Sequence, residues 1–201
     1  MGSMATQAEV SNEDRLRAGW YALLAQLLSR EPDEAVLQTL RGLEGDGSEL
    51  GEGIRALATA ARGTTVEAAG REYFDLFIGL GQGELLPYAS YYLTGFLNEK
   101  PLARLRADMA RLRIARADDV KEPEDHIAAL CEMMSGLITG SFGAPADLAE
   151  QRRFFDTHIG CWAPRFFEDL QGAQAAVLYM PVGTIGRLFM AIEVQAFDMA
   201  A

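Results

Sequence analysis

The chain holds two histidines and two cysteines, the side chains best suited to binding a metal. His158 and Cys161 are three residues apart, a spacing that places both on one face of a helix. A zinc site needs four ligands, and Cys131 is the only other thiol in the sequence. A packed cysteine beside a capping or core histidine is therefore the simpler interpretation, and we expect no metal site.

Motifs for catalysis are equally sparse. Asp125 and His126 are adjacent, as in metal-dependent phosphohydrolases, but those sites require several further histidines. The glycine-rich run of residues 79–83 resembles a phosphate-binding loop, yet it follows a predicted helix and lacks the lysine of a P-loop. The sequence therefore predicts no catalytic residues and no cofactor. An enzyme that uses a metal or a nucleotide through His158, Cys161 or this loop is the weakest alternative.

Aromatic side chains gather on both sides of the glycine run. Tyr73 and Phe77 precede it, whereas Tyr88, Tyr91 and Tyr92 follow it. Such side chains bring a large apolar area, and tyrosine adds a polar tip, which suits the capture of a peptide. Core packing is the alternative interpretation for any single one of them.

The segment from Glu122 to His126 has the composition of a helix N-terminus. Proline at the first helical position, followed by Glu124 and Asp125, is favourable because carboxylates face the positive end of the helix dipole. A helix N-terminus does not explain the presence of His126, because a protonated histidine would be a cation at the positive end of the helix dipole. His126 flanks the buried stripe of the predicted helix, where it can be half-buried and reach a groove. Asp125 can orient the imidazole or accept a hydrogen bond from a basic ligand.

The elements that must position these residues are helices. Apolar residues recur at helical spacing along nearly the whole chain, and no segment alternates as an exposed strand does. The pattern predicts an all-α fold, with about ten helices in a single compact domain spanning residues 11–201. The first expected helix begins after Ser11, which forms a capping-box pattern with Asp14, and ends near Pro32. Further helices are expected over 33–43, 50–62, 66–78, 88–97, 101–115, 123–138, 146–159 and 162–170. A short piece is expected near residue 175, and a last helix after Pro181.

Composition limits the classes of function. Residues 1–10 are expected to form a disordered segment with an expression scar, since Gly2 and Ser3 precede a second methionine. We expect no secretory signal, because residues 1–4 lack its charged and apolar regions, and no apolar run reaches the about 20 residues that span a bilayer. The net charge of -11 argues against nucleic-acid binding, which relies on basic side chains; it either steers a basic partner or serves solubility. Two cysteines outside any CxxC spacing predict a reducing, cytoplasmic location.

Three segments carry a resemblance to a known family when taken in order. They are Tyr73-x-x-Leu76-Phe77-x-Gly79 with Pro87-Tyr88-x-Ser90-x-Tyr92, then Glu122-Pro123-Glu124-Asp125-His126, and last Phe154-Phe155-x-x-His158-x-x-x-Trp162-x-x-x-Phe166-Phe167-x-Asp169-Leu170. From about residue 12 onward the chain resembles the TorD/DmsD family of redox-enzyme maturation chaperones, with NarJ-type relatives. The Gly-Pro-Gly common in that family is here Gly79-Leu80-Gly81, which keeps the glycines and loses the proline.

The resemblance implies an all-helical chaperone without enzymatic activity. It would bind the twin-arginine leader of a molybdenum-cofactor oxidoreductase precursor in the cytoplasm and assist cofactor insertion before export. A leader starts basic and continues apolar, which suits acids beside an aromatic groove. The residues implied to line this groove are Tyr73, Leu76, Phe77, Pro87, Tyr88, Ser90, Glu124, Asp125 and His126. His158 and Trp162 are interpreted mainly as fold-stabilising.

Two points stay open in the sequence. A helical adaptor that recognises a mature partner surface, rather than a leader, is the second hypothesis for function. The break at residues 140–145 is typical of hinges in helical bundles that exchange elements, so a domain-swapped homodimer stands beside a monomer as an expectation.

Overall fold

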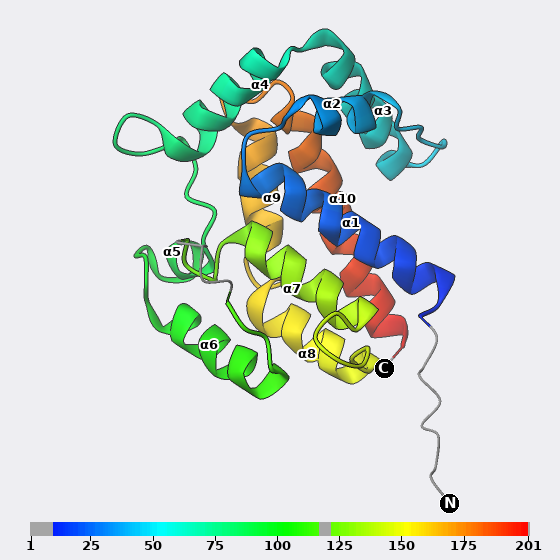
Figure 1. The fold of residues 1–201 in the computed structure, drawn as a ribbon, viewed down its shortest axis with the longest axis vertical. Coiled ribbons are helices and arrows are strands. Elements are labelled where there is room, and N and C mark those ends of the chain that lie inside the picture. Colours follow the sequence, from blue (N-terminus) through cyan, green and yellow to red (C-terminus); the bar gives the residue numbers. More distant parts are fainter. Residues whose placement is uncertain (1–9, 117–121, 201) are drawn as a thin grey trace, which may run out of the picture.

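The computed structural model describes residues 10–116 and 122–200, and within these ranges the chain is helical with no strand, which confirms the predicted all-α class (Figure 1). The predicted disordered segment of residues 1–10 lies outside the described residues except for Val10. The helices are α1 (Asn12–Ser29), α2 (Glu34–Arg41), α3 (Glu49–Gly63), α4 (Val66–Tyr73), the π-helical turn η1 (Phe74–Ile78), α5 (Ala89–Thr94), α6 (Lys100–Leu112), α7 (Ile127–Thr139), α8 (Leu148–His158), α9 (Ala163–Gly172) and α10 (Tyr179–Met199).

Side-chain caps explain why several helices begin near the predicted positions. In five of them the residue before the helix accepts a hydrogen bond from the N–H three residues on; these caps are Ser11, Asp33, Ser48, Thr65 and Asp147. Such a cap stabilises a helix by about 1 kcal/mol. At Ser11 the hydroxyl accepts from the N–H of Asp14 at 3.0 Å and donates to the Asp14 carboxylate at 2.9 Å.

Several predicted boundaries were wrong. The helices expected over 88–97 and 101–115 end three residues early, at Thr94 and Leu112, and the short piece expected near residue 175 is a turn. The helix expected over 123–138 begins only at Ile127, because His126 is its N-cap. The helix expected over 66–78 changes at Phe74 into the π-helical turn, in which the N–H of Gly79 reaches the carbonyl of Phe74 at 2.7 Å. The last helix starts two residues before Pro181, which is tolerated in a first turn where its missing N–H has no helical partner.

The core forms where the long helices cross. α1 packs along α7, and α10 packs along α9 and α3 (Figure 1). Close approach of α10 to α9 requires glycine: a Cβ on Gly183 would lie 2.5 Å from the backbone nitrogen of Gln171, and one on Gly186 only 2.2 Å from the ring of Phe167. No helix within residues 10–116 and 122–200 is long and apolar enough to cross a membrane.

Candidate functional site

Two of the motif segments meet in an isolated antiparallel bridge between Tyr88 and His126. The N–H of Ala89 donates to the carbonyl of Asp125 at 3.0 Å, and the N–H of Ile127 donates to the carbonyl of Pro87 at 2.9 Å. The bridge joins the segment before α5 to the segment before α7. Five of the nine predicted site residues, Pro87, Tyr88, Ser90, Asp125 and His126, therefore lie at one place.

Asp125 is a buried cap for α5 rather than an exposed acid. Its Oδ2 accepts the backbone N–H of Ser90 at 2.8 Å, and only 1% of the residue is exposed. Among the described residues, neither the other oxygen of Asp125 nor the hydroxyl of Ser90 has a hydrogen-bond partner, although both atoms are buried. Leaving a buried polar atom unpaired is unfavourable, so this point of the bridge is a local weakness in the packing.

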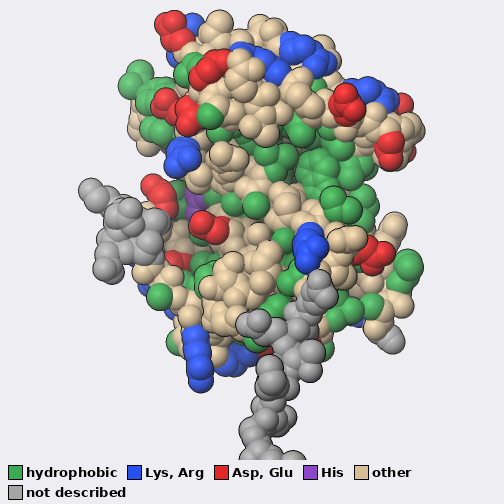
Figure 2. Space-filling model, turned by 45° about the vertical axis from the view of Figure 1, so that its right-hand side comes forward, with side chains coloured by type: hydrophobic (Ala, Val, Ile, Leu, Met, Phe, Trp, Pro, Cys, Tyr) green, Lys and Arg blue, Asp and Glu red, His purple; other side chains and the backbone are tan. Residues whose placement is uncertain are grey.

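His126 caps α7 in its neutral form. Its Nδ1 accepts the N–H of Ala128 at 3.1 Å, and its ring packs edge-to-face on Tyr88 with centroids 5.0 Å apart. Burial lowers the pKa of His126 to about 4, outweighing the opposing effect of Glu122 and Asp125. A neutral acceptor suits a helix N-terminus, which accounts for a histidine where a cation would be unfavourable. With 8% exposed, it lies deeper than the expected half-buried edge. Figure 2 shows that very little histidine surface is exposed on the face it draws.

The two glutamates of this motif differ in their partners. Glu124 accepts from Arg106 at 2.8 Å and lies 3.7 Å from Arg116. Burial acts to raise the pKa of Glu124, but the hydrogen bonds and charges of these arginines hold it below its usual range. Glu122 is exposed and accepts a hydrogen bond from the hydroxyl of Tyr88. Burial and this carboxylate raise the pKa of Tyr88. Glu122 is thus the acid that the motif presents to solvent.

The remaining predicted residues form an aromatic cluster against α10. Phe77 lies between Tyr73 and Tyr179, at centroid distances of 5.0 and 5.5 Å. Tyr73 donates to the carbonyl of Leu28 at 3.3 Å, and burial followed by the charge of Glu122 raises its pKa to about 12. Leu76 is fully buried. Of this group, Phe77 alone is partly exposed.

The glycine run forms a defined loop. The N–H groups of Glu84 and Leu85 bond back to the carbonyls of Asp75 and Leu76, at 3.1 and 2.8 Å. Gly79 has a φ of 61°, and a Cβ there would lie 2.1 Å from the carbonyl oxygen of Gln82, so glycine is required. The loop follows a π-helical turn and carries no lysine, which gives it no resemblance to a phosphate cradle.

Two glutamates that the sequence did not single out hold this region to the segment that connects α9 to α10. The carboxylate of Glu72 accepts the N–H groups of Val177, Leu178 and Tyr179, at 2.7, 3.0 and 2.8 Å. Glu84 accepts those of Gln174 and Ala175 in the same way, at 2.6 and 3.0 Å. Each caps a turn about a hundred residues away in sequence, so no local pattern could have indicated them. The only sequence signal is that the segment before α10 lacks a capping side chain of its own.

His158 and Trp162 connect α6, α8 and the start of α9. The Nε2 of His158 lies 2.8 Å from the Asp108 carboxylate on α6, and the indole N–H of Trp162 donates to the carbonyl of His158 at 2.7 Å. Burial lowers the pKa of His158 although Asp108 opposes the shift. Within residues 10–116 and 122–200, no three metal-ligating side chains form a cluster.

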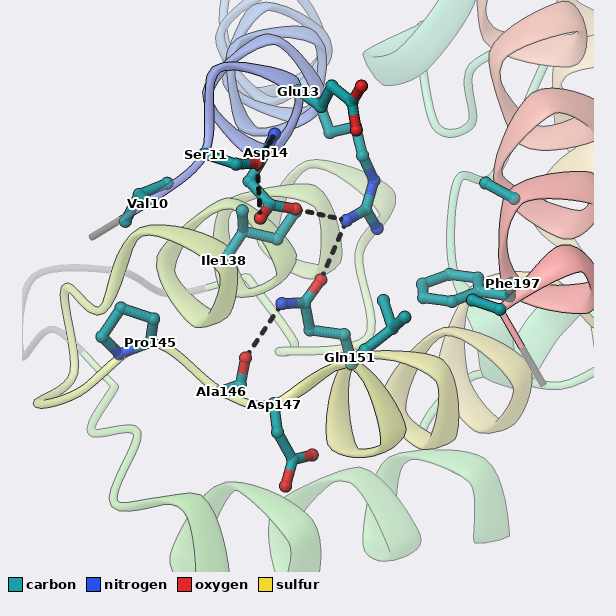
Figure 3. Close-up of a pocket in the computed structure, with 14 residues that line it drawn as sticks. Val10, Ser11, Glu13, Asp14, Ile138, Pro145, Ala146, Asp147, Gln151 and Phe197 are labelled. Atoms are coloured by element: carbon teal, nitrogen blue, oxygen red, sulfur yellow. Dashed lines mark hydrogen bonds and ion pairs between the residues drawn. The ribbon is translucent and has the colours of Figure 1, made fainter. Parts of the chain in front are cut away.

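A pocket of about 510 Å³ lies away from the motifs, where the starts of α1 and α8 meet the end of α10 (Figure 3). Its polar groups satisfy one another: Arg17 donates to Asp14, Gln151 and Glu193, and its guanidinium lies over the ring of Phe197. Figure 3 shows the hydrogen bonds running from Asp14 through this guanidinium to Gln151. We interpret the pocket as part of the framework because these polar groups are already paired.

Comparison with known proteins identifies the family. Residues 43–168 match the nitrate reductase delta subunit family. The chain is 28% identical to the chaperone protein TorD of Vibrio atlanticus, over 92% of this chain and 94% of that protein. It is 31% identical to the chaperone protein TorD of Photobacterium profundum, over 77% of this chain and 81% of that one.

Among solved structures, the chain is similar to a putative redox enzyme maturation protein from Archaeoglobus fulgidus. The TM-score is 0.57 at 22% identity, covering 88% of this chain and 94% of the other, a likeness that shows the fold. The predicted resemblance is confirmed, as is the prediction of a chaperone rather than an enzyme, because the relatives are named as chaperones. The chain belongs to the nitrate reductase delta subunit family and is a TorD-type chaperone.

Proposed function

We propose that this TorD-type chaperone acts in the maturation of a redox enzyme. It binds the twin-arginine leader of a molybdenum-cofactor oxidoreductase precursor in the cytoplasm and holds the precursor until its cofactor is inserted and export can follow. Family membership supports the general role. The main support for a leader as the ligand is the bridge between Tyr88 and His126. This bridge brings together the two motif segments that the family resemblance implies line the leader-binding groove.

The electrostatics of the bridge suit a ligand that starts basic. Glu122 is exposed beside the partly exposed ring of Tyr88, so a cation and an adjoining apolar group can be bound at neighbouring points. The net charge of -11 adds a field that steers a basic peptide toward the surface.

The nine predicted residues divide into two roles in this proposal. Phe77 and Tyr88 are partly exposed and contact the leader directly. The others set the shape of the surface: Ser90, Asp125 and His126 fix the bridge, Glu124 binds Arg106, and Tyr73, Leu76 and Pro87 are buried beneath it.

Site-specific crosslinking tests the proposal and separates it from the adaptor hypothesis. A photo-reactive amino acid is placed at Tyr88, and in a control variant at Leu16, an exposed position on α1. The variants are mixed with a full-length molybdoenzyme precursor and with the same precursor lacking its leader. We expect a crosslink from position 88 that maps to the leader and is lost without it. A crosslink that persists after leader deletion and maps to the mature enzyme would favour the adaptor instead.

A further inference from the structure

The stretch between Arg71 and Lys100 combines negative charge with exposed apolar side chains. It contains four acids, Glu72, Asp75, Glu84 and Glu99, and no lysine or arginine. Its exposed large apolar residues are Ile78, Leu80, Tyr91, Leu93, Phe96 and Leu97. An exposed apolar surface rimmed by one sign of charge is typical of an interaction site for a partner of the opposite charge.

Leu80 stands at the tip of the glycine loop with 99% of its surface exposed. The loop is fixed rather than slack, because the N–H of Gly79 is bonded to Phe74 and the carboxylate of Glu84 is bonded to Gln174 and Ala175. Because Leu80 is exposed on a fixed loop, burial of its side chain does not stabilise the free protein. It also loses little conformational freedom when a partner covers it, which favours binding.

A second exposed apolar group lies at the end of α5. The helix stops at Gly95, which has a left-handed φ of 82°. Leu93 precedes this glycine, and Phe96 and Leu97 follow it. Phe96 is 70% exposed. We call Leu93, Phe96 and Leu97 together the α5 patch.

The loop tip and the α5 patch are close enough for one peptide to cover both. The glycine loop and α5 both lie on the left side of the ribbon in Figure 1, joined by residues 84–88. An extended chain advances by about 3.3–3.6 Å per residue and a helix by about 1.5 Å. Leu93 follows Leu80 by nine residues up to Ala89 and four residues of α5, so the two are at most roughly 38 Å apart. A peptide of about eleven extended residues, or about twenty-five helical ones, covers that span. Tyr88 lies on the chain between the two groups.

Two arginines near this surface are paired with carboxylates, whereas Lys100, next to Glu99, is exposed. Arg165 pairs with Asp169 at 3.0 Å, the carboxylate group that also accepts from Tyr92, and Arg106 pairs with Glu124 at 2.8 Å. The exposed carboxylates of Asp75, Glu99 and Glu122 outnumber Lys100, so the local potential is negative.

We propose that the apolar stretch of the client leader lies across Leu80, Tyr88 and the α5 patch, while its arginines face Asp75, Glu99 and Glu122. This inference rests on the proposed leader-binding function and adds where the leader lies. It assigns direct contact to residues outside the family motifs and a supporting role to the buried motif residues Leu76, Ser90 and Asp125. Charge complementarity selects the occupant, since an acid-rimmed apolar surface matches a peptide that is basic at one end and apolar after it.

The test is a titration of a fluorescently labelled synthetic leader peptide, carrying the arginine pair and the apolar stretch, with the full chain. Leu80→Gln and Phe96→Gln are each expected to weaken the affinity about tenfold, as loss of one buried apolar side chain does. Leu16→Gln is the matched control, because Leu16 is 69% exposed on α1, and it is expected to bind as the wild type does. Leu80→Met, which keeps an apolar side chain of similar size, is expected to retain most of the wild-type affinity. Unchanged melting temperatures identify the effect as one on binding.

The outcomes separate this inference from the proposed function. Wild-type binding with unchanged affinity in both glutamine variants would overturn the inference and leave the proposed function standing. Absence of binding by the folded wild-type chain would overturn both. If the two substitutions instead dissociate a dimer in sedimentation and leave leader affinity unchanged, the surface joins two copies of this chain and the inference is wrong.

A separate variant tests the proposed contact between the leader arginines and the exposed carboxylates. Asp75→Asn combined with Glu99→Gln is expected to weaken binding at low ionic strength and to flatten the loss of affinity as salt is added. A salt dependence identical to that of the wild type would overturn the assignment of the leader arginines to these carboxylates.

Discussion

The carboxylate of Asp125 accepts the backbone N–H of Ser90 at 2.8 Å, so a residue just before α7 caps the start of α5. The same two residues carry buried polar atoms without hydrogen-bond partners among the described residues. The motif that the family resemblance assigns to ligand binding is thus also a structural joint between two segments.

Asp125→Ala removes the acceptor of this joint and leaves the N–H of Ser90 buried. We expect a loss of about 1–3 kcal/mol in the free energy of unfolding, measured by urea denaturation. Asp125→Asn keeps one side-chain oxygen for the N–H and is expected to lose less. Equal stability of the alanine variant and the wild type would contradict a structural role for Asp125.

His126 makes the stability of the fold depend on pH. Its folded-state pKa is about 4, below the ordinary value of about 6.5 in the unfolded chain, so the unfolded state binds a proton first as the pH falls. Its contribution is complete above pH 6.5 and is lost between about 6.5 and 4, by roughly 3 kcal/mol in total.

The matched variant for this pH dependence is His126→Asn, which keeps a capping oxygen but does not titrate. The difference in unfolding free energy between wild type and variant, followed from pH 7 to pH 4, isolates the contribution of the histidine. A difference that stays constant over this range would show that the imidazole is protonated equally in both states.

Glu72 stabilises the start of α10 from a distant helix. Glu72→Ala leaves the N–H groups of Val177, Leu178 and Tyr179, which lead into α10, without their acceptor. It is expected to lower the unfolding free energy by about 1–3 kcal/mol. Glu67→Ala on the same helix breaks an exposed pair with Arg71 and is expected to cost at most about 1 kcal/mol. Chemical denaturation of both variants checks the order, and equal losses would refute the long-range cap.

Two glycine-to-alanine substitutions should act in opposite directions. In Gly186→Ala the new Cβ meets the ring of Phe167 and forces α10 away from α9, at an expected cost of about 1–3 kcal/mol. In Gly19→Ala the Cβ meets nothing within 4 Å, so the better helix propensity of alanine should stabilise the fold by about 1 kcal/mol. Melting temperatures that shift the same way in both variants would contradict the close packing of α9 and α10.

Sequence patterns were sufficient for helices whose ends are fixed locally. Ser11 and Asp147 cap their own helices, so periodicity and cap residues place α1 and α8 closely. The start of α7 was missed because His126 becomes a cap only after the bridge to Tyr88 forms. Pro123, Glu124 and Asp125 are also typical of a first helical turn. The local sequence therefore could not distinguish a helix that begins at Pro123 from one that begins at Ile127.

The candidate site was predictable as a set of residues but not as a surface. The resemblance indicated that Tyr88, Ser90, Asp125 and His126 belong together, and the bridge places them together. Their burial depends on how α5 and α7 pack and has no signature in the sequence. The sequence showed that a leucine stands at position 80 in place of the proline common in the family, but its exposure could be seen only in the fold.

Recognition of a leader through its arginines can be measured by a calorimetric titration of the wild-type chain with a twin-arginine leader peptide, alongside the same peptide with both arginines replaced by glutamine. We predict saturable one-site binding of the natural leader, weakening as salt is added, and an affinity for the glutamine peptide lower by about tenfold or more. Equal affinity for the two peptides, or no heat of binding from several natural leaders with a folded chain, would contradict leader binding by this surface.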